Sequence, residues 1–150
     1  MPLLVYLADL YHDYLPTRQH VPLGIGYIGE YLKQQFPDQI EVRLFKSAEK
    51  LLHHIDERPP QIIGLSNYTW NSALNQFAGA EIKSGSGGDI PIIMGGPNIR
   101  LDDEGIRSFL ELHHYVDRYV MFSGERPMAD IIGLVLDLPD GDYYVAFQSL

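Results

Sequence analysis

The chain has 150 residues, of which 45% are hydrophobic and 21% are charged, and its formal net charge is −9. This is the composition of one globular domain with a single core, and the negative charge argues against a surface that follows nucleic-acid phosphates. The absence of cysteine excludes disulfides, thiolate catalysis, cysteine zinc sites and an iron–sulfur cluster held by the chain itself. No apolar run approaches the roughly 20 residues that span a bilayer, and the first residues lack the basic start of a signal peptide. We therefore expect a cytoplasmic protein with no membrane partner and no nucleic-acid partner.

Short apolar runs bounded by turn residues predict four strands, at 3–10, 61–65, 91–94 and 118–122. The segment at 40–45 alternates between apolar and polar residues and predicts a further strand, the second along the chain, nearer an edge of the sheet. Helical periodicity predicts a helix after each strand. The first begins at Pro22 and ends near Phe36, the second is capped by Ser47 and ends near Glu57, and the last covers about 127–136. The third and fourth are predicted from their apolar residues, which are Leu74, Phe77, Ala78 and Ile82 in the third and Ile106, Phe109 and Leu110 in the fourth, beginning at Asp102 or Asp103.

This alternation predicts an α/β fold, a flavodoxin-like or Rossmann-like doubly wound parallel sheet of five strands between two layers of helices. With right-handed crossovers, the expected strand order is 2-1-3-4-5. We expect one domain over 1–150, with its core at about 3–136. In the extension at 137–150, we expect an Asp140-Gly141 turn followed by a further strand at 143–147.

The central feature of the chain is the fourth strand, which ends abruptly in Gly95-Gly96. In an open α/β sheet, ligands bind beyond the carboxyl ends of the strands. Two residues without Cβ would let a ligand approach the backbone there, although a tight turn that needs positive φ explains the pair equally well. Three strand ends should line this edge together, and they offer a hydroxyl, bare backbone, amides, one carboxylate and flat apolar rings: Ser66, Asn67, Tyr68 and Trp70; Gly95, Gly96, Pro97 and Asn98; Ser123, Gly124 and Glu125.

Other proteins of this topology fit the strand ends poorly. Gly24, Gly26 and Gly29 match the dinucleotide-binding spacing G-x-G-x-x-G, but they follow the first strand by about a dozen residues and fall inside a helix. We interpret them as close packing of that helix against the sheet or against a flat ligand. A phosphorylated receiver domain would need an aspartate at Ser66-Asn67, and a flavodoxin would need a short phosphate loop in place of 11–21.

Four motifs occur in order along the chain: Pro22-Leu23-Gly24-x-x-Tyr27-Ile28-x-x-Tyr31-Leu32, Ile63-Gly64-Leu65-Ser66-Asn67-Tyr68-x-Trp70-Asn71, Ile93-Met94-Gly95-Gly96-Pro97-Asn98 and Gly124-Glu125-Arg126-Pro127. Together they resemble the cobalamin-binding domain found N-terminal to radical SAM enzymes, over about residues 3–135. The resemblance implies a domain that holds cobalamin base-off, with the dimethylbenzimidazole tail detached from cobalt and buried in the sheet. It places Ser66 against the buried base, gives the tail clearance at Gly95-Gly96, and puts the loop before Gly24 under the corrin.

The chain departs from that family in two ways. The wider cobalamin family carries Asp-x-His-x-x-Gly in the first loop, with the histidine ligating cobalt. Here the nearest match runs from His20 to Gly24, with one extra residue and no aspartate two positions before the histidine. His20 is the candidate cobalt ligand, and His12 is a weaker one. The second departure is the lack of any Cys-x-x-x-Cys-x-x-Cys, so the iron–sulfur cluster and S-adenosylmethionine would belong to a partner domain or subunit.

The remaining candidates are weaker. The pairs His53-His54 and His113-His114 are interpreted as solvated helix surface, because adjacent helical residues point in different directions. Asp9, at the end of the first strand, fits either a loop cap or a hydrogen bond to a corrin amide. The sequence therefore predicts a cobalamin-binding module that presents the cofactor to a radical SAM partner, most plausibly for methyl transfer. Two other functions are kept beside it: a flavodoxin-like interaction or regulatory domain with an empty pocket, and an enzyme of the NAD type.

Overall fold

The computed structural model describes residues 1–14 and 21–137. Its five strands are β1 (Leu3–Ala8), β2 (Ile40–Phe45), β3 (Ile62–Ser66), β4 (Ile92–Gly95) and β5 (Arg118–Val120). They form one parallel sheet in the order β2-β1-β3-β4-β5, as the sequence predicted. The register pairs Leu7 with Gly64 and Ser66 with Gly95, so the ends of β3 and β4 lie side by side.

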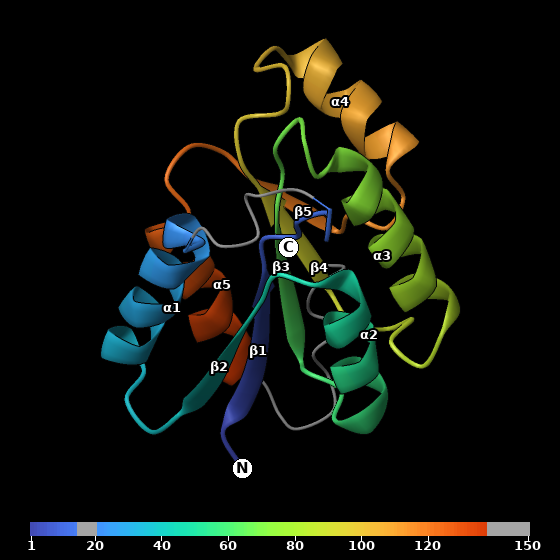
Figure 1. Ribbon diagram of the computed structural model, residues 1–150. Coiled ribbons are helices and arrows are strands. Elements are labelled where there is room, and N and C mark those ends of the chain that lie inside the picture. Colours follow the sequence, from blue (N-terminus) through green and yellow to red (C-terminus); the bar gives the residue numbers. More distant parts are fainter. Residues whose placement is uncertain (15–20, 138–150) are drawn as a thin grey trace.

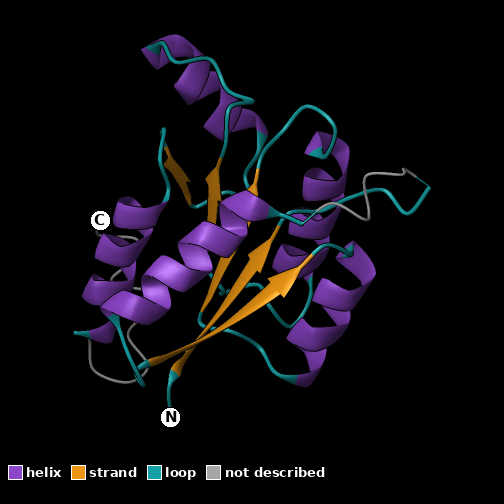
Figure 2. Ribbon diagram, turned by 60° about the vertical axis from the view of Figure 1, so that its left-hand side comes forward, coloured by secondary structure: helices purple, strands orange, loops and turns teal. Residues whose placement is uncertain are grey.

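Five helices cover the sheet: α1 (Leu23–Gln35), α2 (Ala48–Glu57), α3 (Ser72–Ser84), α4 (Asp103–Leu112) and α5 (Glu125–Leu136). Helices α1 and α5 lie together on one face, and α2 and α3 lie on the other, with α4 beyond the end of α3 (Figure 1). Figure 2 shows the strands between the two helical layers. The predicted three-layer α/β architecture is confirmed.

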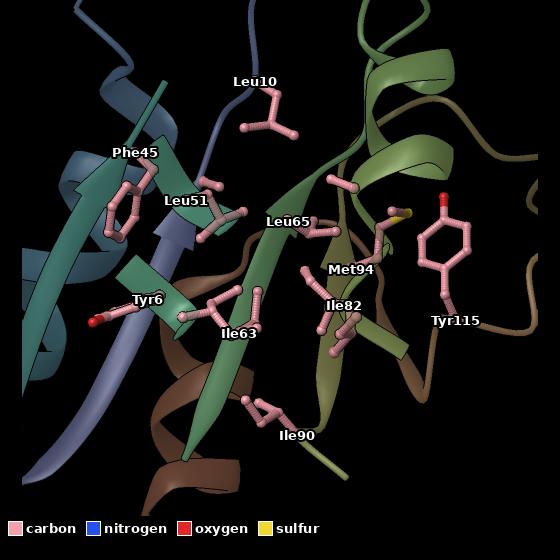
Figure 3. Packing of buried hydrophobic residues seen from close by; sticks show 14 of the residues in the cluster. Tyr6, Leu10, Phe45, Leu51, Ile63, Leu65, Ile82, Ile90, Met94 and Tyr115 are labelled. Atoms are coloured by element: carbon pink, nitrogen blue, oxygen red, sulfur yellow. The ribbon is translucent and has the colours of Figure 1, made fainter. Parts of the chain in front are cut away.

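Each face of the sheet has its own apolar core. On the α2/α3 face, Ile63 and Leu65 of β3 lie between Tyr6 of β1 and Met94 of β4 (Figure 3). On the other face, the strands pack against Ile25 and Leu32 of α1 and against Met128, Ile132 and Val135 of α5. Helices cover both faces of the sheet, so β1 is buried along its whole length. This burial on both sides explains why its sequence is a continuous apolar run.

Most of the predicted boundaries lie within two residues of the observed ones. Ser47 caps α2, since its Oγ accepts a hydrogen bond from the amide of Lys50 at 3.3 Å. The fifth strand ends at Val120, earlier than predicted, because Phe122 has a φ of 61° and turns the chain away from the sheet. Helix α5 begins two residues before Pro127. The predicted strand at 143–147 lies outside the described residues.

The predicted apolar face of α3 was wrong at Phe77, whose side chain is 55% exposed. The helix instead presents Asn75, Ala78, Gly79 and Ile82 to the sheet. Buried Asn75 is held there because its Nδ2 donates a hydrogen bond to the carbonyl of Ser66 at 2.8 Å. Gly79 lies under the ring of Tyr115, where any Cβ would overlap the ring atoms.

The three glycines of the dinucleotide-like spacing lie inside α1, as the sequence indicated. Gly29 is buried against the sheet, and a Cβ there would lie 3.4 Å from Cγ1 of Val42. A Cβ at Gly26 would meet no atom within 4 Å. None of the three forms the tight turn after a strand on which dinucleotide binding depends.

Candidate functional site

A cavity of about 230 Å³ opens at the carboxyl edge of the sheet, between the strand ends and helices α1 and α5. A cavity of roughly 150 Å³ with apolar walls accommodates benzene, so this space is large enough for a larger flat ring system. The apolar part of its lining comes from both the sheet and the helices, in Leu7, Ile25, Ile28, Ile93, Val120 and Met128. The polar part comes from the strand ends, at Asp9, Ser66, Tyr68, Ser123 and Glu125.

Gly64 in the middle of β3 lines this cavity. A Cβ at this position would lie 2.7 Å from Cδ2 of Leu7 and 3.5 Å from Cε of Met128. Any larger side chain would therefore enter the space between the sheet and α5. The glycine keeps this part of the cavity open.

Gly95 and Gly96 also line the cavity. Gly96 has a φ of +130°, and a Cβ there would collide with the carbonyl oxygen of Asn67 and lie 2.9 Å from its amide nitrogen. The carbonyl of Gly96 accepts a hydrogen bond from the hydroxyl of Tyr119 at 2.7 Å. The turn at Gly96 has positive φ, as one interpretation of this pair required, and the bare backbone of the pair borders the cavity. That a ligand approaches this backbone stays a prediction.

A buried polar network lies at the end of β1 and β3. Asp9 is 6% exposed, and its Oδ1 accepts hydrogen bonds from Oγ of Ser66 at 2.6 Å and from Nδ2 of Asn71 at 3.3 Å. The hydroxyl of Tyr11 donates to Oδ2 of Asp9 at 3.2 Å. Burial, followed by the charge of Asp9, raises the pKa of Tyr11 to about 12, so this hydroxyl stays protonated. Helix α3 joins the network through Asn75, whose Nδ2 donates to Oδ1 of Asn71 at 3.2 Å.

The structure brings eight of the strand-end and motif residues proposed from the sequence around the cavity: Gly24, Ser66, Tyr68, Gly95, Gly96, Ser123, Gly124 and Glu125. Five others lie outside its lining: Leu23, Asn67, Trp70, Pro97 and Asn98. His20 lies outside the described residues. His12 is described, and its ring packs against Tyr14 at a centroid distance of 5.1 Å without lining the cavity.

The outlying residues support the cavity in different ways. Nδ2 of Asn67 donates hydrogen bonds to the carbonyl of Asn98 at 3.0 Å and to the hydroxyl of Tyr119 at 3.2 Å, which ties together the loops after β3 and β4. Trp70 is half exposed and stacks on Tyr68, with ring centroids 4.3 Å apart and an interplanar angle of 7°. Tyr68 and the exposed Phe122 thus place aromatic rings at the cavity.

Sequence reasoning missed several lining residues. Gly64 and Met128 looked like ordinary strand and helix positions, and only the pairing of β1 with β3 brings Leu7 beside Gly64. Phe122 lay within the expected strand, although a bulky residue with positive φ is a conformational outlier of the kind that often lies at functional sites. Asp9, for which the sequence left a loop cap or a bond to a corrin amide open, accepts hydrogen bonds from the side chains of Ser66 and Asn71.

The paired histidines are only partly the solvated surface that we predicted. His53 and His114 are exposed, but His54 packs edge-on against Phe45 with ring centroids 5.2 Å apart. His113 ends α4, and its ring lies 4.3 Å from that of Phe109. Burial lowers the pKa of His113, and its Nδ1 has no hydrogen-bond partner among residues 1–14 and 21–137. Residues 1–14 and 21–137 contain no group of three or more acidic or histidine side chains placed to hold a metal ion.

No family model matches the chain, and no curated protein matches it. A solved structure of a cobalamin-binding protein from Desulfitobacterium hafniense DCB-2 matches with a TM-score of 0.65 and 15% sequence identity. The match covers 87% of this chain and 57% of that one, so the present chain spans little more than half of the matched protein. At this identity the likeness shows the shared fold.

Among the described residues, no helix is both long and apolar enough to cross a membrane.

Proposed function

We propose that this chain is a cobalamin-binding module that holds the cofactor base-off, with the dimethylbenzimidazole base in the cavity beside β3 and β4. The observation that carries the proposal is the cavity itself, which has mainly apolar walls and is opened by Gly64, Gly95 and Gly96. Its position beyond the carboxyl ends of parallel strands is the usual ligand position in such sheets. The motifs of the sequence, and the shared fold with a protein described as cobalamin-binding, support the same assignment.

The residues around the cavity fit such a base in size and polarity. Apolar side chains of α1 and α5 would cover its faces, namely Ile25, Ile28 and Met128. Ser66 would meet a nitrogen of the base, and the backbone at Gly95-Gly96 would leave room for the tail. The stacked pair of Tyr68 and Trp70 offers flat apolar area next to the cavity for the wide corrin ring.

Cobalamin, when bound, would supply a cobalt centre that can carry a methyl group, and the chain's own role would be to bind and orient it. We propose further that the partner is a radical SAM catalytic domain or subunit and that the chemistry is methyl transfer. Both proposals rest on the resemblance in the motifs. They predict a Cys-x-x-x-Cys-x-x-Cys segment in an associated domain or protein. His20 is proposed as the residue that would ligate cobalt.

The test is to mix the purified protein with hydroxocobalamin or methylcobalamin, pass it through gel filtration and record the absorption spectrum. The proposal predicts retained colour with a base-off spectrum. Gly64→Leu would fill the cavity from β3 and should abolish retention, whereas Gly26→Ala, on the helix facing no neighbouring atom, should retain it. Circular dichroism would establish that both variants fold. A well-folded wild-type protein that retains no cobalamin would contradict the proposal and favour the interaction-domain alternative.

The same spectrum tests His20. Loss of a cobalt-bound imidazole changes the absorption of the bound cofactor, so His20→Ala should shift the spectrum while the cofactor stays bound. An unchanged spectrum would rule out His20 as the ligand.

A further inference from the structure

The hydroxyl proton of Ser66 already takes part in a hydrogen bond within the protein. Oγ of Ser66 donates to Oδ1 of Asp9 at 2.6 Å, which is the length of a hydrogen bond to an ionised carboxylate. A serine hydroxyl has one proton and two acceptor lone pairs. Nδ2 of Asn71 lies 3.4 Å from the same oxygen as a donor, so Ser66 is already an acceptor within the network. What Ser66 offers to a ligand in the cavity is therefore a lone pair.

The charged side chains of the cavity also favour a ligand that donates a hydrogen bond. Its only charged lining side chains, among residues 1–14 and 21–137, are the carboxylates Asp9 and Glu125. Within the described part of the chain, no lysine, arginine or histidine lines it. A ligand that carries a positive charge or an N–H donor is favoured in such surroundings, and one that presents only lone pairs is disfavoured.

The groups packed around Asp9 keep it an acceptor. Tyr11 donates to its second oxygen and stays protonated at neutral pH. Tyr68, from the loop after β3, lines the same cavity. Nζ of Lys46 lies over the ring of Tyr11, 5.4 Å from its centre, and Lys46 does not line the cavity. Helix α1 contributes only uncharged lining residues, and α5 contributes Glu125.

We propose that the cavity selects a heteroaromatic group that donates a hydrogen bond to Ser66, with Asp9 fixing Ser66 as the acceptor. This inference rests on the proposed function when it is applied to cobalamin. The free nitrogen of dimethylbenzimidazole has a lone pair and no proton once it has left cobalt. To match Ser66 it takes one proton from solvent, so the module binds the base in its protonated, cationic form.

The first experiment measures that proton. Calorimetric titration with cobalamin at mildly alkaline pH, in two buffers of different ionisation enthalpy, should show uptake of about one proton for each cobalamin bound. The apparent Kd should rise about tenfold for each pH unit in this range. Cobinamide, which lacks the nucleotide tail, should bind without proton uptake. Asp9→Asn keeps an oxygen that can accept from Ser66 but removes the charge, and should strongly reduce the uptake. Cobalamin binding without proton uptake in the wild type would overturn the inference and leave the proposed function standing.

The second experiment needs no corrinoid. Indole and benzofuran have the same shape, but indole carries an N–H donor where benzofuran has an oxygen. Ligand-observed NMR should find indole bound about tenfold more tightly, because benzofuran supplies no donor for the remaining lone pair of Ser66. Ser66→Ala should remove the difference. If cobalamin fails to bind while indole is still preferred, the proposed function is wrong and the inference holds; equal binding of the two fragments to the wild type would overturn the inference.

Discussion

The turn at Gly96 should not tolerate any side chain, even the smallest. Gly96→Ala places a Cβ against the carbonyl oxygen of Asn67 and 2.9 Å from its amide nitrogen, and these are backbone atoms that cannot rotate away. The positive φ of +130° costs a non-glycine residue about 1–3 kcal/mol, and the overlap adds about 1–3 kcal/mol. We expect a loss of about 2–6 kcal/mol, out of the 5–15 kcal/mol that a domain of this kind typically has.

Urea denaturation followed by circular dichroism measures this loss as a change in the free energy of unfolding. Gly26→Ala is the matched control, because its Cβ meets nothing and its φ is helical. It should raise the free energy of unfolding by about 0.5–1 kcal/mol. If Gly96→Ala were as stable as the wild type, the turn would not be held as described, and the backbone approach at the cavity would lose its explanation.

Three further changes probe the packing and the titrating groups. Gly79→Ala should lower the free energy of unfolding by about 1–3 kcal/mol, because its Cβ overlaps the buried ring of Tyr115; an unchanged urea midpoint would contradict this packing. Hydrogen bonds from Arg58 lower the pKa of Glu41, so its contribution to stability is complete above pH 4.5 and is lost as the pH falls through the lower folded value. Glu41→Gln should therefore show a weaker loss of stability in acid. Burial lowers the pKa of His113 from 6.5, so the unfolded chain binds more protons below that pH and stability falls there. His113→Phe should remove that part of the pH dependence, and an unaltered profile of unfolding free energy against pH would refute it.

The sequence contains the information for the sheet and for most of its helices. The alternating segment at 40–45 and the apolar run at 61–65 are bounded by prolines and turn residues, and the cap at Ser47 fixes the start of α2. These signals are local, so pattern reasoning can find them. The Gly95-Gly96 pair was also visible, because adjacent glycines at a strand end have few explanations.

Long-range contacts decide the features that were missed. Which face of α3 packs on the sheet depends on buried Asn75. Its Nδ2 donates a hydrogen bond to the carbonyl of Ser66, nine residues earlier in the chain. Apolar periodicity favoured Phe77 for that face because an asparagine is not expected in a core without knowledge of its partner. Gly64 becomes part of the cavity only through the register that places Leu7 beside it. The bond from Ser66 to Asp9 joins residues 57 positions apart, and no local pattern indicates it.

If the cavity holds the tail of cobalamin, the protein should distinguish cobalamin from cobinamide. Cobalamin and cobinamide share the corrin but differ in the nucleotide tail, so their dissociation constants, measured by absorbance titration, isolate what the cavity contributes. We expect base-off cobalamin to bind at least tenfold more tightly than cobinamide, and this difference in affinity to be lost in Gly64→Leu. Equal affinities for the two corrinoids, or no binding of either, would contradict it.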